Sequence, residues 1–548
     1  MTWWKEAVIY QIYPRSFYDS NGDGVGDLKG IIQKLDYLNG KEDSLGIDAI
    51  WLSPVYPSPM FDFGYDISDY EKIDPVFGDL NIFKELLFEA HKRNIKIIMD
   101  LVVNHTSHLH PWFIESRSSL KSKKRNWYIW KYPIKEKSVK NKTPNEWMSV
   151  FGGSAWEFDE LTGQYYYHAF YKEQPDLNWR NEEVKEAIYK MMRYWLDMGV
   201  DGFRLDVVNF YIKDDLFRNN PKNFFKGLRA YDRQYHIYDI NRPETHDITR
   251  EMRKILDSYK DKMSVGEVAQ EAPGSAHLPA SFYGEESDEL HMAFNFSFLY
   301  SKWGPGHFAK IIKDWGTVLK SSDWPNYTLS NHDQRRHFSR YSKGRETHDR
   351  AKIAALMLLT LRGTPFLYYG EEIGMKSARI PKKRIQDPVG KTYWPFYAGR
   401  DNARTPMCWN HSEKAGFTTG EPWLPINNNH KIVNVEKELN DPESLLNFYK
   451  KLIKVRKERI SLKLGYQEFA NNNSEKTLAY YRYLNNERLL VLLNFTNKQD
   501  RFIIESSKVQ SGKYRLAFST HGKESIEVTN GIIEIVPYEG MIIVIQEN

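Results

Sequence analysis

Cysteine, long apolar runs and an excess of charge of either sign are all missing from this sequence. A single cysteine, Cys408, occurs in 548 residues, so no disulfide can form within the chain and an oxidising compartment is not required. No run of about 18 apolar residues is present, and the first residues lack the basic and then apolar segments of a secretory signal. We therefore expect a cytoplasmic protein that makes no contact with a membrane.

The net charge is only +5, and the basic residues are scattered along the chain. One local run, Lys121, Lys123, Lys124 and Arg125, is typical of a solvated loop, so we expect no nucleic-acid partner. Aromatic residues are frequent, with 35 Tyr, 29 Phe and 16 Trp, and such rings can stack on sugars or bases as well as build a core. The length and the hydrophobic content of 41% indicate a globular protein of roughly two to four domains.

Eight short apolar segments alternate with helical patterns and predict parallel strands. The predicted strands are 7–13, 49–52, 96–103, 202–209, 263–268, 292–298, 327–330 and 365–369, with helices at 80–93, 182–198 and 349–361 among their connections. No sequence repeat accompanies the alternation. The pattern favours an α/β fold in which eight strands and their helices close into a (β/α)8 TIM barrel.

Two further regions do not fit the barrel pattern. Residues 105–178 are too many for a simple connection after strand three and are rich in Trp, Tyr and Lys, which predicts a small inserted domain over one mouth of the barrel. Beyond residue 472 short alternating strands predict an antiparallel β-sandwich. The predicted domains are the barrel (1–104 and 179–472, with an irregular excursion around 375–429), the inserted domain (105–178) and the C-terminal β domain (473–548).

The fourth predicted strand carries Arg204 and Asp206 within an otherwise apolar segment. Charged groups rarely enter a strand buried on both faces unless they are paired or functional. Residues two apart point to the same side of a strand, so the guanidinium can hold the carboxylate ionised. This stretch alone does not distinguish a structural ion pair from a functional one.

Other polar side chains gather at the C-terminal ends of the predicted strands, the face that carries the active site of such barrels. They are Asp100, Asn104 and His105 after strand three, Glu267 after strand five, and Asn331, His332 and Asp333 after strand seven. Carboxylates from strands four, five and seven are therefore predicted to converge with two histidines and an arginine. A purely structural role explains such a ring poorly.

Glycoside cleavage requires two carboxyl groups that flank the scissile bond, one as nucleophile and one as proton donor. Arg204 would keep Asp206 ionised, whereas Glu267 has no basic neighbour in the sequence and could stay protonated. Asp333 could bind sugar hydroxyls as positive charge develops on the ring. A divalent-metal site made of Asp, Glu and His is the alternative, and the spacing does not exclude it.

The same residues carry a resemblance to a known family. Asp100-Leu-Val-Val-Asn104-His105, Gly202-Phe-Arg204-Leu-Asp206, Gly266-Glu267-Val268 and Asn331-His332-Asp333 resemble, in order, the four signature regions of the α-amylase family, glycoside hydrolase family 13. Residues 4–17, 64–70, 174–178, 399–407 and 416–423 resemble its α-glucosidase and oligo-1,6-glucosidase branch. The resemblance extends over nearly the whole chain.

The resemblance implies a catalytic role for each carboxylate. Asp206 would be the nucleophile, Glu267 the acid/base and Asp333 the stabiliser of the transition state, with no cofactor needed for catalysis. Further residues would form the −1 subsite, the pocket for the terminal glucose. Arg204, His105 and His332 would contact the sugar ring, and Asp62, Tyr65 and Arg404 would close the pocket, with Asp62 paired to Arg404.

Residues 19–27 have oxygen-bearing groups at alternate positions, with glycines between them, as in an EF-hand loop. The candidate metal ligands are Asp19, Asn21, Asp23, Val25 and Asp27. The twelfth position is Gly30 instead of Glu, and no flanking pair of helices is evident. The family resemblance implies a structural Ca²⁺ or Mg²⁺ here, away from catalysis, and a glycine-rich turn without metal is the alternative.

Substrate choice rests on few residues. In this branch a valine after the nucleophile accompanies activity on α-1,6 links, so Val207 favours isomaltose-like substrates. Residues 386–390 and 231–244 resemble maltase or sucrose-acting relatives instead, and one methyl group changes a preference by only about 1–3 kcal/mol. We therefore expect an exo-acting retaining α-glucosidase of di- and short oligosaccharides, of the isomaltose, maltose or sucrose type, as a monomer or homodimer.

Two alternatives remain. Related enzymes pass the glucosyl group to a sugar acceptor, so a glucosyl transferase or a sucrose isomerase could use the same intermediate. A binding-only protein resembling the amino-acid-transporter heavy chains would lack catalytic carboxylates and carry a membrane helix. This sequence has all three carboxylates and no such helix.

Overall fold

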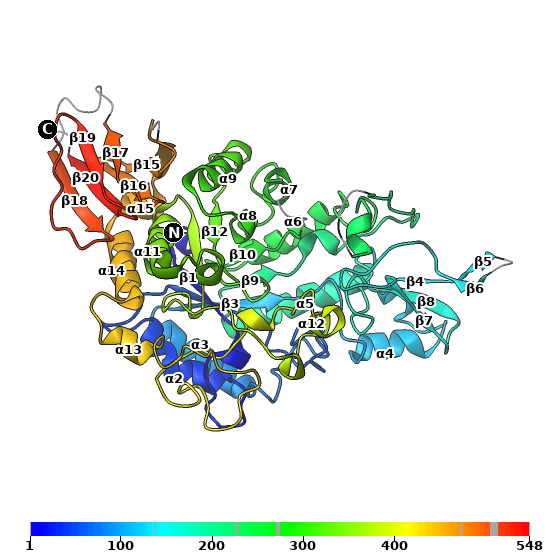
Figure 1. The fold of residues 1–548 in the computed structure, drawn as a ribbon. Helices are drawn as coiled ribbons and strands as arrows, with labels where there is room; N and C mark the ends of the chain where they lie inside the picture. The colour runs from blue at the N-terminus through cyan, green and yellow to red at the C-terminus, as the bar shows by residue number, and fades with distance from the viewer. Residues whose placement is uncertain are drawn as a thin grey trace.

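Eight parallel strands form the centre of the molecule (Figure 1). The computed structural model describes residues 2–136, 139–224, 227, 229–269, 275–471, 474–504 and 513–546. Around the barrel the strands follow chain order: β1 (Ile9–Ile12), β2 (Ala49–Leu52), β3 (Lys96–Leu101), β9 (Gly202–Leu205), β10 (Met263–Gly266), β11 (Met292–Ala293), β12 (Asn326–Thr328) and β13 (Thr364–Tyr368). β13 returns to pair with β1. The predicted (β/α)8 fold is confirmed.

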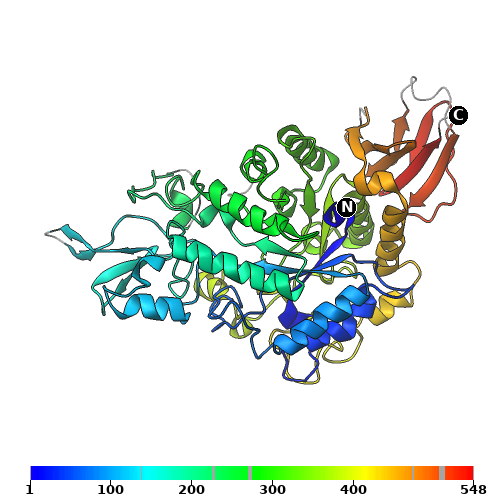
Figure 2. The ribbon, with the colours of Figure 1, turned by 180° about the vertical axis from the view of Figure 1, so that it is seen from behind.

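Helices cover the outside of this barrel, and Figure 2 shows α2 and α3 in blue and α5 in blue-green along one side. Because both faces of the strands are covered, every residue of β1, β2, β9, β10 and β13 is buried. The helices are α1 (Trp3–Glu6), α2 (Leu28–Leu38), α3 (Leu80–Lys92), α4 (Pro111–Ser118), α5 (Glu182–Met198), α6 (Thr245–Asp257), α7 (His277–Ser281), α8 (Ser297–Tyr300), α9 (Pro305–Val318), α10 (His337–Arg340), α11 (Thr347–Thr360), α12 (Pro388–Tyr393), α13 (Val435–Leu439), α14 (Leu445–Glu458) and α15 (Ile460–Leu464).

The ends of α3 and α5 follow from single residues. The Asp79 side chain accepts hydrogen bonds from the backbone N–H groups of Asn81 and Ile82 and so caps the start of α3. Asn181 caps α5 in the same way, and Gly199, at a φ of 113°, ends it. These local signals place both helices within a residue of their predicted bounds.

The barrel sheet has its two end strands at β11 and β12. The Asn326 side chain of β12 crosses between them, because its Nδ2 donates to the Ala293 carbonyl of β11 at 2.7 Å. The sequence predicts a longer sixth strand, residues 292–298, but the strand ends at Ala293 and α8 begins at Ser297. Asn295 explains the change, because its side chain accepts the Ser297 N–H and favours a turn over continued pairing.

The predicted inserted domain follows β3. Its antiparallel sheet contains β4 (Trp130–Lys131), β8 (Gln164–Tyr167) and β7 (Trp156–Asp159), and α4 precedes it. A second pair of strands, β5 (Ile134–Glu136) and β6 (Val139–Lys142), extends away from the body of the molecule (Figure 1).

The C-terminal domain lies at the opposite end of the molecule from β5 and β6 (Figure 1). One antiparallel sheet has the order β14 (Tyr466–Phe469), β15 (Thr477–Leu484), β16 (Glu487–Asn494), β20 (Gly540–Gln546) and β18 (Lys513–Ser519), and β17 (Asp500–Ile503) pairs with β19 (Ile532–Ile535). Buried Phe502 and Ile533 of the small sheet share one core with Leu490 and Ile543 of the large one. The predicted β-sandwich is therefore confirmed.

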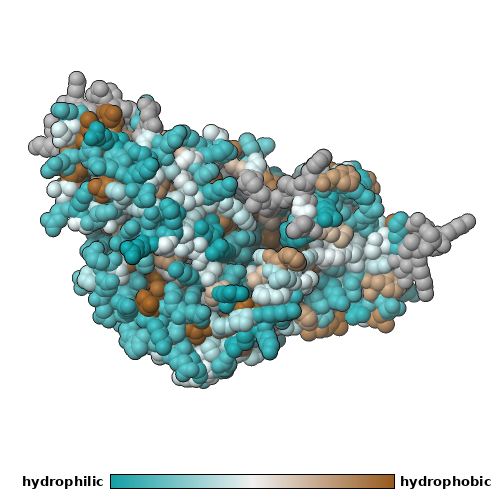
Figure 3. All heavy atoms as spheres, viewed as in Figure 1, coloured by the Kyte–Doolittle hydropathy of each residue, from teal (hydrophilic) through white to brown (hydrophobic). Residues whose placement is uncertain are grey.

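Side chains on the face shown in Figure 3 are mostly hydrophilic. Among the described residues, no helix combines the length and the apolar character needed to cross a membrane.

Candidate active site

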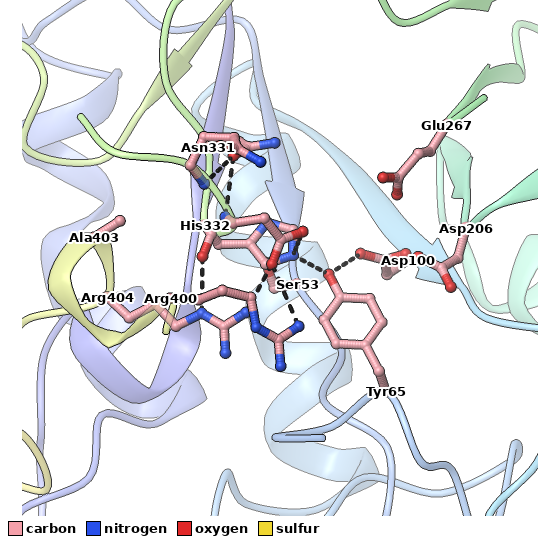
Figure 4. Close-up of polar contacts among 12 residues, drawn as sticks. Ser53, Tyr65, Asp100, Asp206, Glu267, Asn331, His332, Arg400, Ala403 and Arg404 are labelled. Atoms are coloured by element: carbon pink, nitrogen blue, oxygen red, sulfur yellow. Dashed lines mark hydrogen bonds and ion pairs between the residues drawn. The ribbon is translucent and has the colours of Figure 1, made fainter. Parts of the chain in front are cut away.

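Three neighbouring strands bring the first group of polar side chains together. The register of the parallel sheet pairs Asp100 on β3 with Arg204 on β9, and Arg204 with Val265 on β10. The Glu267 N–H donates to the Leu205 carbonyl at 2.8 Å, so the chain continues in register beyond β10. Asp206 and Glu267 therefore lie side by side just past the strand ends (Figure 4).

One guanidinium group joins three carboxylates. Arg204 Nη1 lies 2.6 Å from Asp100 Oδ1 and 2.8 Å from Asp206 Oδ1, and its Nη2 contacts Glu267 Oε2. The sequence offers Glu267 no basic neighbour, but the fold supplies one, because β9 and β10 are adjacent. Arg204 itself is buried, and these contacts with anions raise the pKa of its guanidinium above its usual range despite the burial.

Burial is the largest influence on Asp206. It raises the pKa of the Asp206 carboxyl to about 6, and the Arg204 guanidinium opposes that rise. The carboxylate is therefore mostly ionised at neutral pH. The prediction that Arg204 helps to keep Asp206 ionised agrees with this geometry, although the arginine only partly offsets the cost of burial.

Asp333 lies across the site, next to two further arginines (Figure 4 shows Arg400 and Arg404 opposite Asp206 and Glu267). Its Oδ1 accepts a hydrogen bond from Arg404 Nη2 at 2.8 Å and lies 3.6 Å from Arg400 Nη1. Burial would raise the pKa of Asp333, but His332 and both arginines lower it below its usual range. Its side chain is 28% exposed, against 8% for Asp206, so Asp333 stands nearer the opening of the site.

The floor of the site contains Tyr65 and His332. Their rings are parallel within 2°, with centroids 5.4 Å apart, and Tyr65 Oη lies 2.6 Å from His332 Nε2. Burial lowers the pKa of His332 to about 3, so its ring is neutral at physiological pH. Tyr65 Oη also donates to Asp100 Oδ2 at 3.1 Å, which links this floor to the Arg204 cluster.

The expected pairing of Asp62 with Arg404 is wrong. Asp62 Oδ1 lies 2.6 Å from Arg400 Nη2, and Arg400 also binds Asp387 at 3.0 Å. Arg404 turns instead to Asp333 and donates through Nε to the His332 carbonyl at 2.8 Å. A single 3₁₀ turn, Asp401–Ala403, separates the two arginines, so the two lie close together along the chain. The sequence therefore does not tell which arginine pairs with Asp62, and the packing of the turn determines it.

The inserted domain contributes one wall through Gln174. Its Nε2 lies 3.2 Å from Asp62 Oδ2 and 3.0 Å from His105 Nε2, and it is fully buried. His105 Nε2 lies 3.0 Å from the Tyr65 carbonyl oxygen, so all of these groups share one corner. No role is predicted for Gln174 or Arg400 from the sequence, although both lie in stretches that resemble the α-glucosidase branch, and that resemblance is the only signal for them.

Val207 has a strained backbone. Its φ is +36° and its ψ +51°, in the left-handed region that β-branched residues avoid. Its side chain is buried with Phe170, Phe210 and other apolar residues beside the inserted domain. Strain of this kind costs about 1–3 kcal/mol and is common at functional sites.

The loop predicted to bind a metal uses its carboxylates for backbone hydrogen bonds. Asp19 accepts from the N–H groups of Asn21, Gly22 and Gly24, Asp23 accepts from Val25, and Asp27 accepts from Ser20 and Gly30. Within the described ranges, no three His, Cys, Asp or Glu side chains converge as metal ligands, so the arrangement seen here does not form a carboxylate cage. Cation binding by this loop stays a prediction.

Comparison with known proteins agrees with this geometry. Residues 11–465 match the α-amylase catalytic domain, and residues 477–542 match the C-terminal domain of the α-amylase SusG. The chain therefore belongs to the α-amylase family and is a glycoside hydrolase. Within that family its near-full-length relatives support an α-glucosidase.

Relatives and solved structures of similar length have several named activities. The oligo-1,6-glucosidase of Parageobacillus thermoglucosidasius is 43% identical over 98% of both chains, and the trehalose-6-phosphate hydrolase of Bacillus subtilis (strain 168) is 40% identical over 92% of both. The α-glucosyl transfer enzyme XgtA has a TM-score of 0.91 at 37% identity, with 100% of both chains covered. The trehalulose synthase MutB of Pseudomonas mesoacidophila MX-45 has a TM-score of 0.88 at 34% identity, again over 100% of both chains.

Proposed function

We propose that this protein is an exo-acting, retaining α-glucosidase that removes single glucose units from the non-reducing end of di- and short oligosaccharides. The observation that carries the proposal is the set of three carboxylates at one mouth of the barrel. Asp206 lies deep beside Arg204, Glu267 stands next to it just past the adjacent strand, and Asp333 is paired with Arg404, which lies on the opposite side of the site (Figure 4). A double displacement at an anomeric carbon requires a pair of carboxyls, one as nucleophile and one as acid/base, and the third carboxyl can stabilise the positive charge that develops on the ring.

Each carboxyl has a defined task in this mechanism. Asp206 attacks the anomeric carbon while Glu267 gives a proton to the departing glycosidic oxygen, which leaves a β-glucosyl ester on Asp206. Water then attacks the same carbon and loses a proton to Glu267, so that α-glucose leaves and both carboxyls return to their starting states. In the first step Glu267 must turn from the Arg204 guanidinium to the glycosidic oxygen, whereas Asp206 keeps its Arg204 contact.

The closed corner of the site supports the exo mode. Asp62, bound to Arg400 at 2.6 Å and to Gln174 at 3.2 Å, is 4% exposed and stands beyond the floor formed by Tyr65 and His332. In this proposal, the carboxylate and guanidinium groups at this corner bind hydroxyls of the terminal glucose and so close the site to a further glucose unit. The single observation behind this part of the proposal is the Asp62–Arg400–Asp387 bridge.

We infer that Val207 influences which glycosidic linkage is cleaved, because it follows the proposed nucleophile and packs against apolar residues of the inserted domain. The oligo-1,6-glucosidase name of several relatives supports α-1,6 links. A second candidate function is glucosyl transfer or sucrose isomerisation. It is favoured by the names of two structural neighbours, a glucosyl transfer enzyme and a trehalulose synthase, and it would use the same ester with a sugar in place of water.

Product analysis tests both candidates. The protein is incubated separately with isomaltose, maltose, sucrose, trehalose and trehalose 6-phosphate, and the sugars are separated at early times. α-Glucose released first, seen by ¹H NMR before mutarotation, supports the retaining hydrolase. New disaccharides or trisaccharides as the main early products support transfer, and β-glucose as the first product contradicts retention.

Asp206→Asn tests the nucleophile. We expect a loss of roughly 10⁴-fold or more in kcat, because a neutral amide cannot attack the anomeric carbon. Asp214→Asn is the matched control, because Asp214 is also a buried aspartate bound to an arginine, Arg218, at 2.5 Å, but it does not contact Asp206, Glu267 or Asp333. Turnover of the Asp206→Asn variant at the control level contradicts the assignment.

A further inference from the structure

Gln11 on β1 lies directly beneath the site, and the family signature regions give it no role. Its side chain is 1% exposed. Its Nε2 lies 2.7 Å from His332 Nδ1 and 3.3 Å from Ser53 Oγ. The amide therefore touches the one ring nitrogen of His332 that does not face Tyr65.

The hydrogen positions in this network follow from counting donors, starting at Asp100. Asp100 accepts from Arg204 Nη1 at 2.6 Å and from the Trp51 indole at 3.3 Å, so its carboxylate acts as an acceptor. Tyr65 Oη, at 3.1 Å, has a single hydrogen and must give it to Asp100. A tyrosine oxygen that donates to Asp100 can only accept from His332 Nε2, which lies 2.6 Å away.

His332 therefore carries its hydrogen on Nε2. The ring is buried and neutral, so it has one N–H only, and Nδ1 is left as an acceptor. Gln11 meets that acceptor with its NH₂ group. The reverse arrangement would require the Gln11 amide to turn over and present Oε1 to an Nδ1–H, and it would oblige Tyr65 to donate to His332, leaving two acceptors in contact between Tyr65 and Asp100.

We propose that Gln11 is a positioning residue that holds His332 as the Nε2–H tautomer and so keeps Tyr65 donating to Asp100. The inference rests on the proposed function, in which Tyr65 and His332 form the floor under the glucose ring. Its effect reaches the nucleophile, because Asp100 and Asp206 share the Arg204 guanidinium. Gln11 touches no reacting atom and acts only through His332.

The tautomer can be measured on the unmodified protein. The chain is labelled with ¹⁵N-histidine, and the His332 signals in long-range ¹H–¹⁵N spectra are assigned by their loss in His332→Gln. We expect a protonated Nε2 and an unprotonated Nδ1. An Nδ1–H tautomer or a doubly protonated ring overturns the proposal, whichever sugars the enzyme cleaves.

Two substitutions then separate positioning from packing. Gln11→Glu places an acceptor at Nδ1, so the His332 signals should change to an Nδ1–H or doubly protonated ring. We expect kcat/KM to fall about 10–100-fold, by analogy with loss of the partner that orients a metal-ligating histidine. Gln11→Met keeps the volume but removes the NH₂ group, and should lower kcat/KM with a mixture of tautomers.

Asn326→Asp is the matched control, because it makes the same amide-to-acid change at a buried strand position between β11 and β12. It should leave the His332 signals as in the wild type. Unchanged His332 signals in Gln11→Glu overturn the proposal even if activity falls. If the wild type cleaves none of the sugars, the proposed function fails, while the tautomer result still decides the role of Gln11.

Discussion

Charge balance around Arg204 is the main feature of the site at the scale of single residues. One guanidinium contacts Asp100, Asp206 and Glu267, so three buried or half-buried carboxyls share one positive charge. The other two arginines of the site, Arg400 and Arg404, lie with Asp333. Burial raises the pKa of the proposed nucleophile, which shares its arginine with two other carboxyls, whereas His332 and two arginines lower the pKa of the proposed stabiliser. The environment thus separates the roles of two like residues.

The raised pKa of Asp206 predicts the acid side of the pH profile. The pKa is about 6, against 3.8 for an unperturbed aspartate, so Asp206 loses its charge as the pH falls through 6. We expect kcat/KM to decline about tenfold per pH unit below that value, because only the ionised carboxyl attacks. Initial rates on isomaltose or maltose between pH 4 and 8 measure it, and a midpoint near the ordinary aspartate value contradicts it.

Stability should respond to Asp206 in the opposite direction. Because the folded-state pKa lies above the unfolded value, the group favours the folded state most at low pH and destabilises it as pH rises from about 4 to 6. Asp206→Asn removes this dependence. Its melting temperature should therefore change less between pH 4 and 6 than that of the wild type.

At the scale of elements, much of the site could be predicted because parallel strands end on one face. Asp100 lies near the end of β3, whereas Asp206, Glu267 and Asp333 follow β9, β10 and β12, and strand order alone brings the first three together. The pairing of Asp62 with Arg400 could not be predicted. It depends on how residues 388–403, which form short helices and turns, pack against the inserted domain, and no periodic pattern encodes that packing.

Gly202 shows how closely β9 and β10 approach each other. A Cβ atom at this position would lie 2.4 Å from the Met263 carbonyl oxygen, which is backbone and cannot move aside. Gly202→Ala should therefore lower the free energy of unfolding by about 1–3 kcal/mol, the usual cost of overpacking, and reduce activity through displacement of Arg204. Urea unfolding measures the first effect.

The matched control for Gly202 is Gly306→Ala in α9, where an added Cβ meets nothing within 4 Å. That change should leave stability unchanged or raise it by about 0.5–1 kcal/mol. Equal losses in the two variants contradict a specific steric conflict at β9.

The loop before α2 offers a test of the predicted cation. If Ca²⁺ or Mg²⁺ binds the folded loop, a concentration 100 times the Kd stabilises the fold by about 2.7 kcal/mol. The melting temperature should then rise on addition of the ion to EDTA-treated protein. Asp23→Asn should abolish the rise, and Asp43→Asn, a change of another aspartate in a turn outside the loop, should keep it. An absence of any ion-dependent change in the wild type favours the metal-free turn.

At the scale of the whole molecule, Arg482 ties the sandwich to the barrel. It is fully buried on β15, and its guanidinium donates to the Thr360 carbonyl at the end of α11 and to the carbonyls of Leu462 and Gly465 at 3.1 and 3.0 Å. Burial lowers the pKa of this group to about 9, yet it remains charged at neutral pH. The domain order could be predicted from the sequence, but this attachment could not, since a lone arginine in an apolar strand has no visible partner.

Arg482→Met should destabilise the protein by about 3 kcal/mol or more, because four carbonyl groups, including that of Tyr466, lose a donor at about 1–3 kcal/mol each. Denaturant unfolding followed by tryptophan fluorescence measures it. Arg501→Met, whose side chain is 71% exposed and paired with Glu534, should change stability by no more than about 0.5 kcal/mol. Similar effects in the two variants contradict the role of Arg482.

The contact between β11 and β12 is the place where the barrel should open first. These two strands are the ends of the sheet, and within the described residues no strand pairing joins them. The Asn326 side-chain amide forms a hydrogen bond that links β12 to β11. Local opening takes the path with the fewest hydrogen bonds to break. Amide protons of β11 and β12 should therefore exchange with solvent before those of β2 and β3. On heating, the barrel should open first between β11 and β12, before the strands that carry Asp100 and Arg204 separate.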